Sequence, residues 1–323
     1  MVYAAVMGYG TIGSGVVRVI QEHGETIRRK TGQVIRIKYI LDLRDFPDDP
    51  YNDLVIHDVD TIINDPEVSI VVETMGGTHP AFDFVKKAIC AGKSVCTSNK
   101  ELVAAYGVEL LRDARDHDVN FLFEASVGGG IPIIRPLNTA LTADRITGIQ
   151  GILNGTTNYI LTRMEDEGLG FEEVLKDAQK LGYAERNPSA DVDGFDACRK
   201  IAILASIMTG KYVNYEDVPT KGITDITIED MRAAAAEGKA IKLIARAEKT
   251  ADGLKISVGP EWVPNEDELA SVHGVFNAVV VQGSNSDKLM YYGSGAGKMP
   301  TASAVVADIC HTVDAIPAAP LWK

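Results

Sequence analysis

The fold of this chain is decided by its first stretch, Val2-Tyr-Ala-Ala-Val-Met-Gly8-Tyr-Gly10-Thr-Ile-Gly13-Ser-Gly15. Its first six residues are an apolar run that predicts a strand, and apolar residues at helical spacing follow the glycines. Glycines at these positions permit a tight turn, a close backbone approach to a pyrophosphate and the packing of helix on strand. Because strand, turn and helix occur in this order, the stretch predicts a dinucleotide-binding site in preference to a purely structural turn.

Strands and helices alternate through the first part of the chain. After the first strand and helix, the alternation is expected at residues 34–43, 69–73, 80–91, 94–97, 101–117 and 120–124. Strands that alternate with longer helices form parallel sheets covered on both faces. The fold class expected is therefore α/β, with a Rossmann-type doubly wound parallel sheet.

The pattern changes after Gly128-Gly-Gly130. Helices then dominate, at residues 159–167, 171–181, 195–209 and 228–237, and strand-like segments return at residues 241–248, 255–258 and 278–282. A final helix is expected to return to the first domain. The sequence thus predicts a first domain of residues 1–130 with a C-terminal helix 299–323, and a second α+β domain of residues 131–298.

The composition limits the kind of protein this is. A net charge of -13 argues against a nucleic-acid or anionic-membrane binder, since both need clustered positive charge. The N-terminus lacks the basic segment of a signal peptide, and no apolar run is long enough for a membrane helix. The four cysteines form no CxxC motif. We expect a cytoplasmic protein with reduced thiols.

Two charged residues, Asp42 and Arg44, fall at the end of the second expected strand. An acidic residue there binds a ribose 2′-hydroxyl, whereas an arginine binds a 2′-phosphate. Alternation directs both side chains to one face, and a solvated loop charge is the plainer interpretation of either. The choice between NAD and NADP stays open.

Two further segments carry candidate chemistry. Thr97-Ser-Asn-Lys100 follows a strand, at the edge where doubly wound sheets hold ligands, although an ordinary lysine at a helix start would look the same. Asp196 and Lys200 share one helix face and follow a loop that carries Glu185 and Asp191. This cluster is typical of a small polar substrate site, with a surface ion pair as the alternative.

These stretches together resemble homoserine dehydrogenase over nearly the whole chain. The matching motifs occur in the family's order, at residues 8–15, 97–104, 124–132, 151–161, 182–200 and 293–308. The resemblance implies the reversible NAD(P)-dependent reduction of L-aspartate 4-semialdehyde to L-homoserine, a step in threonine and methionine biosynthesis.

In that family, the lysines that match Lys100 and Lys200 lie around the reacting oxygen. Hydride addition to an aldehyde places negative charge on this oxygen, and an ammonium group can both stabilise the charge and donate a proton. We assign Lys200 as the proton donor and Lys100 as the residue that orients the substrate and balances charge. The reverse division of roles stays open.

The resemblance also implies binding residues, among which Glu185 would pair with the α-ammonium group of the substrate. The substrate-binding residues are Glu185, Asp191, Asp196, Gly155 and Thr156. The cofactor-binding residues are Gly8, Gly10, Thr11, Ile12, Gly13, Arg44, Gly76, Lys100, Gly295 and Gly297. A monovalent cation, Na⁺ or K⁺, maps onto Glu124, Val127, Gly129 and Ile131.

The resemblance further implies a homodimer or homotetramer, with the second domain as its substrate-binding, catalytic and dimerisation part. Residues 147–153 are a candidate dimer contact. Many homologues carry a C-terminal regulatory domain that binds amino acids. Since this chain stops at Lys323, we expect neither that domain nor threonine feedback through it.

Two other functions stay open. One is a different NAD(P)-dependent oxidoreductase that acts on an amino-acid-derived aldehyde; an acyl-enzyme type is disfavoured, because no cysteine lies in a polar, glycine-flanked loop. The other is a catalytically inactive dinucleotide-sensing protein. The pair Lys100 and Lys200 argues against it, because a sensor needs no proton donor.

Overall fold

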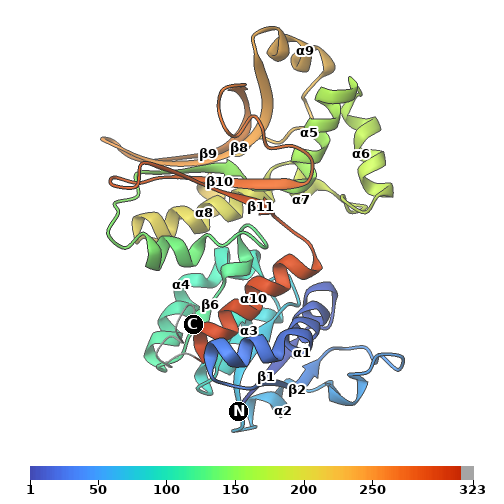
Figure 1. Cartoon of the computed structure of the whole chain (residues 1–323), viewed down its shortest axis with the longest axis vertical. Coiled ribbons are helices and arrows are strands. Elements are labelled where there is room, and N and C mark those ends of the chain that lie inside the picture. Colours follow the sequence, from blue (N-terminus) through green and yellow to red (C-terminus); the bar gives the residue numbers. More distant parts are fainter. Residues whose placement is uncertain (314–323) are drawn as a thin grey trace. The chain divides into compact units, whose positions relative to one another are not determined.

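The computed structural model describes residues 1–313 of the chain. These residues form two compact units, each with its own sheet (Figure 1). The first unit is Met1–Gly130 with the segment that begins at Gly297, and the second is Ile131–Ala296. Within residues 1–313, no helix combines the length and the apolarity that crossing a bilayer requires.

The first unit is built on a six-stranded parallel sheet of order β3-β2-β1-β4-β5-β6. The strand order reverses between β1 and β4, which are neighbours at the centre of the sheet. This is the doubly wound topology expected from the sequence, and the fold class is confirmed. The strands are β1 (Val2–Met7), β2 (Ile35–Leu41), β3 (Val55–Ile56), β4 (Val68–Glu73), β5 (Ser94–Thr97) and β6 (Phe121–Leu122).

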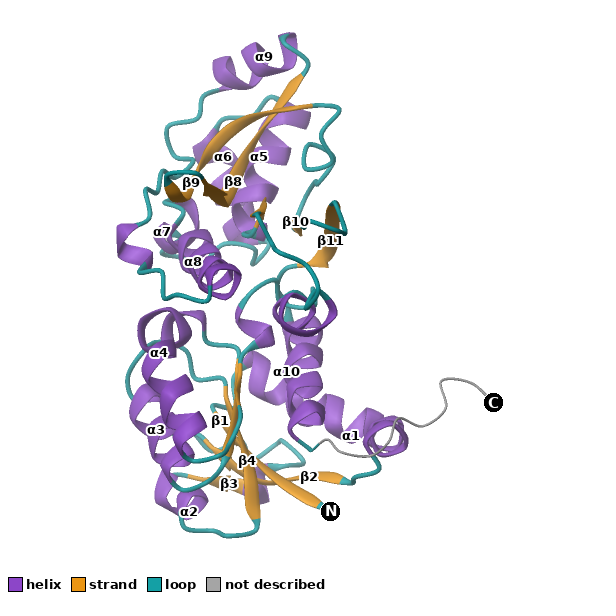
Figure 2. Ribbon diagram, turned by 90° about the vertical axis from the view of Figure 1, so that its left-hand side faces the viewer, coloured by secondary structure: helices purple, strands orange, loops and turns teal. Residues whose placement is uncertain are grey.

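Helices cover both faces of this sheet (Figure 2). On one face lie α1 (Thr11–Thr31) and α10 (Lys298–Thr312). On the other lie α2 (Val59–Ile63), α3 (Ala81–Cys90) and α4 (Lys100–Asp116). Two short 3-10 helices, η1 (Asn52–Leu54) and η2 (Glu124–Ser126), lie in the connections.

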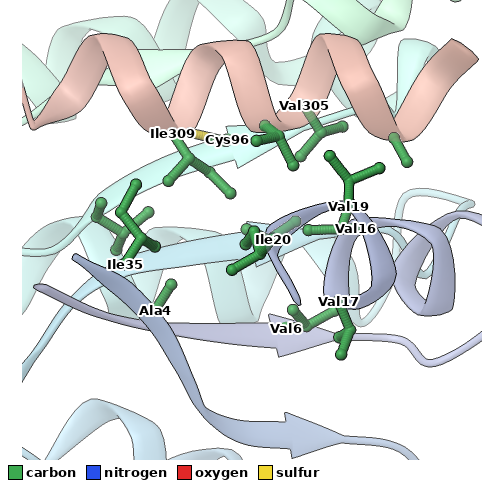
Figure 3. Close-up of a cluster of buried hydrophobic side chains, with 14 of the residues drawn as sticks. Ala4, Val6, Val16, Val17, Val19, Ile20, Ile35, Cys96, Val305 and Ile309 are labelled. Carbon is green, nitrogen blue, oxygen red and sulfur yellow. The ribbon is translucent and has the colours of Figure 1, made fainter. Parts of the chain in front are cut away.

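An apolar core joins α1 and α10 to the sheet (Figure 3). Val16 and Ile20 of α1 meet Val305 and Ile309 of α10 over the buried face of the strands. Burial of each such side chain contributes roughly 1.5–3 kcal/mol. The segment after Gly297 is therefore an integral layer of the first unit. The expected C-terminal helix begins at Lys298 and ends at Thr312, and residues 314–323 lie outside the described part.

The second unit is built on a five-stranded antiparallel sheet of order β11-β10-β7-β8-β9. Its strands are β7 (Gly148–Ile152), β8 (Lys239–Thr250), β9 (Gly253–Pro264), β10 (Phe276–Gln282) and β11 (Lys288–Ser294). Helix α5 packs against β8 and β10, and α8 packs against β7, β8 and β9. The helices are η3 (Pro136–Ala140), α5 (Gly155–Glu167), α6 (Phe171–Lys180), α7 (Ser189–Val192), α8 (Phe195–Thr209), η4 (Tyr215–Asp217) and α9 (Ile228–Ala236).

Candidate active site

The glycine turn after β1 brings a helix N-terminus close to the sheet. Gly8 has a φ of 94°, a left-handed conformation that side chains disfavour. A Cβ on Gly13 would lie 1.9 Å from the Gly8 carbonyl oxygen, so only glycine lets α1 begin here. The N-cap residue of α1, Gly10, offers no capping side chain, and its first turn holds no acidic residue. The N–H groups around Thr11 and Ile12 are therefore suited to a phosphate.

At the end of β2, Asp42 and Arg44 bind one another. The Arg44 guanidinium lies 3.0 Å (Nε) and 3.2 Å (Nη2) from the Asp42 carboxylate, which also accepts the Tyr9 N–H. Burial raises the pKa of Asp42, but the hydrogen bonds from Arg44 and Tyr9 outweigh burial and hold that pKa below its usual value. Arg44 is exposed and lies over the Phe46 ring. The carboxylate is thus occupied within the chain, while the guanidinium faces solvent.

Lys100 is the first residue of α4, directly beyond the end of β5. The side chain of Asn99 caps this helix by accepting the Leu102 N–H, and its amide donates to the Gly77 carbonyl at 2.6 Å. Gly76 lies in the same turn with a φ of 78°. Asn99 therefore ties the start of α4 to the turn after β4, so Gly76 and Lys100 are held at one edge of the sheet.

The expected cation-binding residues divide between the two units. Glu124, Val127 and Gly129 belong to the first unit, and Ile131 is the first residue of the second. The Glu124 side chain is buried, and its N–H donates to Asp308 at 2.8 Å. Gly129 is left-handed, with a φ of 54°. Within residues 1–313, no group of three His, Cys, Asp or Glu side chains could hold a metal ion. Backbone oxygens would have to supply most of any cation shell here.

In the second unit, Lys200 is buried at the start of α8. Its ammonium donates to Asp196 at 2.7 Å, the i,i+4 pair expected from the spacing, and to the Leu153 carbonyl at 2.8 Å. Its exposed fraction is only 8%. Burial of an ammonium is costly unless it is paired, so the aspartate and the carbonyl fix both the charge and the position of Lys200.

Asn154, which the sequence analysis did not single out, organises the acidic residues around Lys200. Its amide nitrogen donates to Asp191 at 2.7 Å and to Asp196 at 2.8 Å. Its side-chain amide oxygen, Oδ1, accepts the Thr157 N–H at 2.8 Å and so caps α5. One buried side chain therefore fixes a helix start and two carboxylates.

Asp191 has an altered proton affinity in this arrangement. Burial, followed by the nearby Asp196 charge, raises its pKa, and Asn154 and Lys200 oppose the rise. Carboxylates that share a site with a lysine in this way are typical of functional sites.

Gly155 and Thr156 begin α5 next to this cluster. A Cβ on Gly155 would lie 2.7 Å from the Val275 carbonyl oxygen, so the close approach requires glycine. The Thr156 hydroxyl donates to the Tyr183 carbonyl at 2.8 Å, which ties α5 to the loop that carries Glu185. Glu185 itself is exposed, and its backbone carbonyl accepts from Gln179.

Asn277, also missed from the sequence, is fully buried beside two expected binding glycines. Its amide nitrogen lies 2.0 Å from where a Cβ on Gly295 would be, and its amide oxygen lies 3.6 Å from one on Gly155. Neither amide atom has a hydrogen-bond partner within residues 1–313. An orphaned buried amide fits a ligand or water that completes it. Gly297, by contrast, lies in the first unit as the N-cap of α10.

The structure thus brings Asp191, Asp196, Lys200 and Thr156 together around Asn154, and leaves Glu185 at the surface. Most of the expected cofactor residues gather at the carboxyl edge of the parallel sheet or just beyond it. Gly295 belongs to the other unit.

Comparison with protein families matches both units of the chain. The model described as "Homoserine dehydrogenase, NAD binding domain" matches residues 8–124, and that described as "Homoserine dehydrogenase" matches residues 132–310. The homoserine dehydrogenase of Bacillus subtilis (strain 168) is 44% identical over 311 residues, which are 94% of this chain and 71% of that protein.

Solved structures give the same result. A homoserine dehydrogenase from Thiobacillus denitrificans superposes with a TM-score of 0.93 and 41% identity, over 97% of this chain and 73% of that one. A hyperthermophilic archaeal homoserine dehydrogenase in complex with NADPH superposes with a TM-score of 0.83 and 28% identity, over 98% and 99% of the two chains.

Proposed function

The chain belongs to the homoserine dehydrogenase family of NAD(P)-dependent oxidoreductases, and from this premise we propose that Lys200 is its proton donor. The reaction interconverts L-aspartate 4-semialdehyde and L-homoserine. The observation that supports the proposal is the buried ammonium of Lys200, held by Asp196 and the Leu153 carbonyl. An ammonium has three N–H donors, and within the described residues these contacts use two. The third is available to a substrate oxygen.

The carboxylates around Asn154 fit an amino-acid substrate. During aldehyde reduction, the third N–H of Lys200 stabilises the oxygen as it gains negative charge and then gives it a proton, directly or through water. Asp196 keeps the ammonium in place. Asp191 and Glu185 supply negative charge for the α-ammonium group of the substrate. Lys100 orients the substrate and balances charge.

The glycine turn after β1 fits a dinucleotide, because Gly13 removes the side chain that would block α1 and no side chain caps that helix. When bound, the nicotinamide supplies the hydride in reduction and accepts it in oxidation. The pyrophosphate would lie at the N–H groups after Gly10. Gly76, Gly295 and Gly297 would line the cofactor with backbone alone.

NADP is the cofactor that the end of β2 favours. The Asp42 carboxylate is already occupied by Tyr9 and Arg44, so it is a poor partner for a ribose 2′-hydroxyl. The exposed Arg44 guanidinium can meet a 2′-phosphate.

Steady-state oxidation of L-homoserine with NADP and NAD separately tests both the activity and this preference. We expect turnover with NADP. We expect Arg44→Ala to raise the KM for NADP by about 10–100-fold, which corresponds to the free energy of a hydrogen bond to a charged group. The KM for NAD should stay within about twofold. If Arg44→Ala raised the KM values for NADP and NAD by the same factor, the proposed role of Arg44 in binding the 2′-phosphate would be contradicted. A folded wild-type protein without turnover would contradict the function.

A monovalent cation, Na⁺ or K⁺, would bind at Glu124 and the backbone oxygens of Val127, Gly129 and Ile131. The donors fit a hard cation, because they are oxygens and include a buried carboxylate. At equal ionic strength, K⁺ or Na⁺ should raise the Tm by about 2–4 °C relative to tetramethylammonium. Glu124→Gln should remove this difference. Equal Tm values for the wild type in all three salts would exclude the site.

A homodimer or homotetramer remains the expected assembly, with one change in how residues 147–153 would take part. Strand β7 is the central strand of its sheet, and both its edges are paired, with β10 and β8. Any contact that β7 makes between copies must therefore use a face of the sheet.

A further inference from the structure

The residue that ends β4, Glu73, lies between the two cofactor motifs of the first unit. In the sheet register Glu73 pairs with Met7, which precedes the glycine turn, and with Thr97, which begins the motif ending in Lys100. This is the point where the strand order reverses, and doubly wound sheets hold their ligands in the crevice there. Glu73 is nevertheless fully buried.

Within the described residues, the hydrogen bonds of the Glu73 carboxylate all come from N–H or O–H donors. One oxygen accepts the N–H groups of Met75 at 2.8 Å and Gly76 at 3.3 Å, and the amide of Asn99 at 3.4 Å. The other accepts the Thr97 hydroxyl at 2.5 Å, and that hydroxyl itself accepts the Asn99 N–H. Burial holds the pKa of Glu73 above its usual value, and the hydrogen bonds from Thr97, Met75, Gly76 and Asn99 limit this rise without cancelling it. A set made of donors alone fits the ionised carboxylate.

These contacts connect the turn that holds Gly76 with the start of the helix that holds Lys100. Asn99 completes the connection through the Gly77 carbonyl. Glu73 therefore positions both segments, although the proposed chemistry assigns it no proton. A glutamine of the same size would keep the acceptor for the backbone N–H groups of Met75 and Gly76 but would remove the negative charge, so it separates these two roles of Glu73.

We propose that Glu73 is a positioning residue whose buried negative charge makes the cofactor site bind oxidised nicotinamide more tightly relative to reduced nicotinamide. The inference rests on the cofactor site proposed above. The oxidised ring carries a positive charge and the reduced ring carries none. A fixed anion at the crevice, away from solvent screening, stabilises only the former. It would thereby favour the oxidised state of the bound cofactor.

The test is the ratio of two dissociation constants, measured on the folded protein without substrate. Reduced NADP is titrated by its fluorescence and oxidised NADP by calorimetry. Glu73→Gln keeps the side-chain volume and the acceptor for Met75 and Gly76. This substitution should raise the dissociation constant of oxidised NADP by about tenfold more than that of reduced NADP. The matched control is Glu67→Gln, which removes the same charge from the exposed residue just before β4 and should leave the ratio unchanged.

A second variant separates charge from position. Glu73→Asp keeps the charge but shortens the side chain, so both constants should rise while their ratio stays within about twofold. If Glu73→Gln raises the dissociation constants of oxidised and reduced NADP equally, Glu73 has only a structural role and the proposal is overturned. If Glu73→Gln does not fold, a tenfold change in the ratio of the two dissociation constants in Glu73→Asp, which keeps the charge, also overturns the proposal. A wild type that binds neither form would instead contradict the proposed cofactor site.

Discussion

Lys200→Met is expected to lower kcat for L-homoserine oxidation by about 10³-fold, within the range of general acid–base catalysis. Methionine fills a similar volume but has no ammonium group, so the alkoxide loses its proton partner and its nearest positive charge. The Kd of NADPH should stay within about twofold, because Lys200 contacts Asp196 and the Leu153 carbonyl and is assigned no contact with the cofactor. Steady-state rates at alkaline pH and a fluorescence titration measure the two quantities.

The control for this variant is Lys211→Met, which removes an exposed lysine just after the same helix. Its kcat should equal that of the wild type. A Lys200→Met enzyme within tenfold of wild-type kcat would exclude Lys200 as the proton donor. If Lys100→Met then lost about 10³-fold, the two lysines would have the reverse roles.

The fold was most predictable where the sequence pattern is long or is bounded by special residues. The strands β1 and β5 and the helix α8 have the residue limits expected from the sequence. The glycines after β1 mark one boundary, and Gly210, a left-handed cap, marks the end of α8.

Elements were missed where they are too short or too exposed to leave a periodic signal. Strand β3 has two residues and α2 has five, both within a loop rich in Pro and Asp. Strand β11 is an edge strand whose residues are all at least partly exposed, so its alternation is weak. Its pairing with β10 is what makes it a strand.

The candidate site was predictable where chemistry follows from local spacing, as for Asp196 and Lys200. Asn154 was missed because the helix was expected to begin at residue 159, whereas it begins at Gly155. An earlier start would have marked Asn154 as an N-cap residue, which is a recognisable signal. Its bonds to Asp191 and Asp196 join residues 37 and 42 positions apart, and no pattern in one sequence reveals them.

Glu73 and Asn277 show a second limit of the sequence. Each is a polar residue inside an apolar run, Val-Ser-Ile-Val-Val-Glu73 and Asn277-Ala-Val-Val-Val, which is the available signal for a buried functional group. The partners of Glu73 come from the register of neighbouring strands. That register is set by packing of the whole sheet, so it is visible only in three dimensions.

Asn154→Asp is expected to lower kcat/KM for L-homoserine by about 10²–10³-fold at pH 8, the effect of about 3–4 kcal/mol in the transition state. The aspartate can still accept the Thr157 N–H, so the cap of α5 is retained. The atom that donated to Asp191 and Asp196 becomes a carboxylate oxygen instead. Three carboxylates then face one another around a single ammonium, that of Lys200.

The stability of this variant should depend on pH with a defined sign. Like charges raise the pKa values of the three carboxyl groups in the folded state above their unfolded values near 4, and the pKa of Asp191 is already raised in the wild type. The folded variant therefore binds protons more tightly than the unfolded chain. Its deficit in unfolding free energy against the wild type is small in acid and grows as pH rises through the raised pKa values.

Urea unfolding at pH 5 and pH 8 measures this deficit, which should widen by at least about 1.4 kcal/mol, one pKa unit. The matched control is Asn214→Asp. Asn214 also caps a short helix and donates to a carboxylate, that of Asp217, but does so at the surface, where solvent screens the added charge. Its deficit should stay within about 0.5 kcal/mol at both pH values. An equal deficit at both pH values would mean that the substitution acts through the shape of the side chain alone. The reason is that only repulsion among the three carboxylates makes the lost unfolding free energy depend on pH.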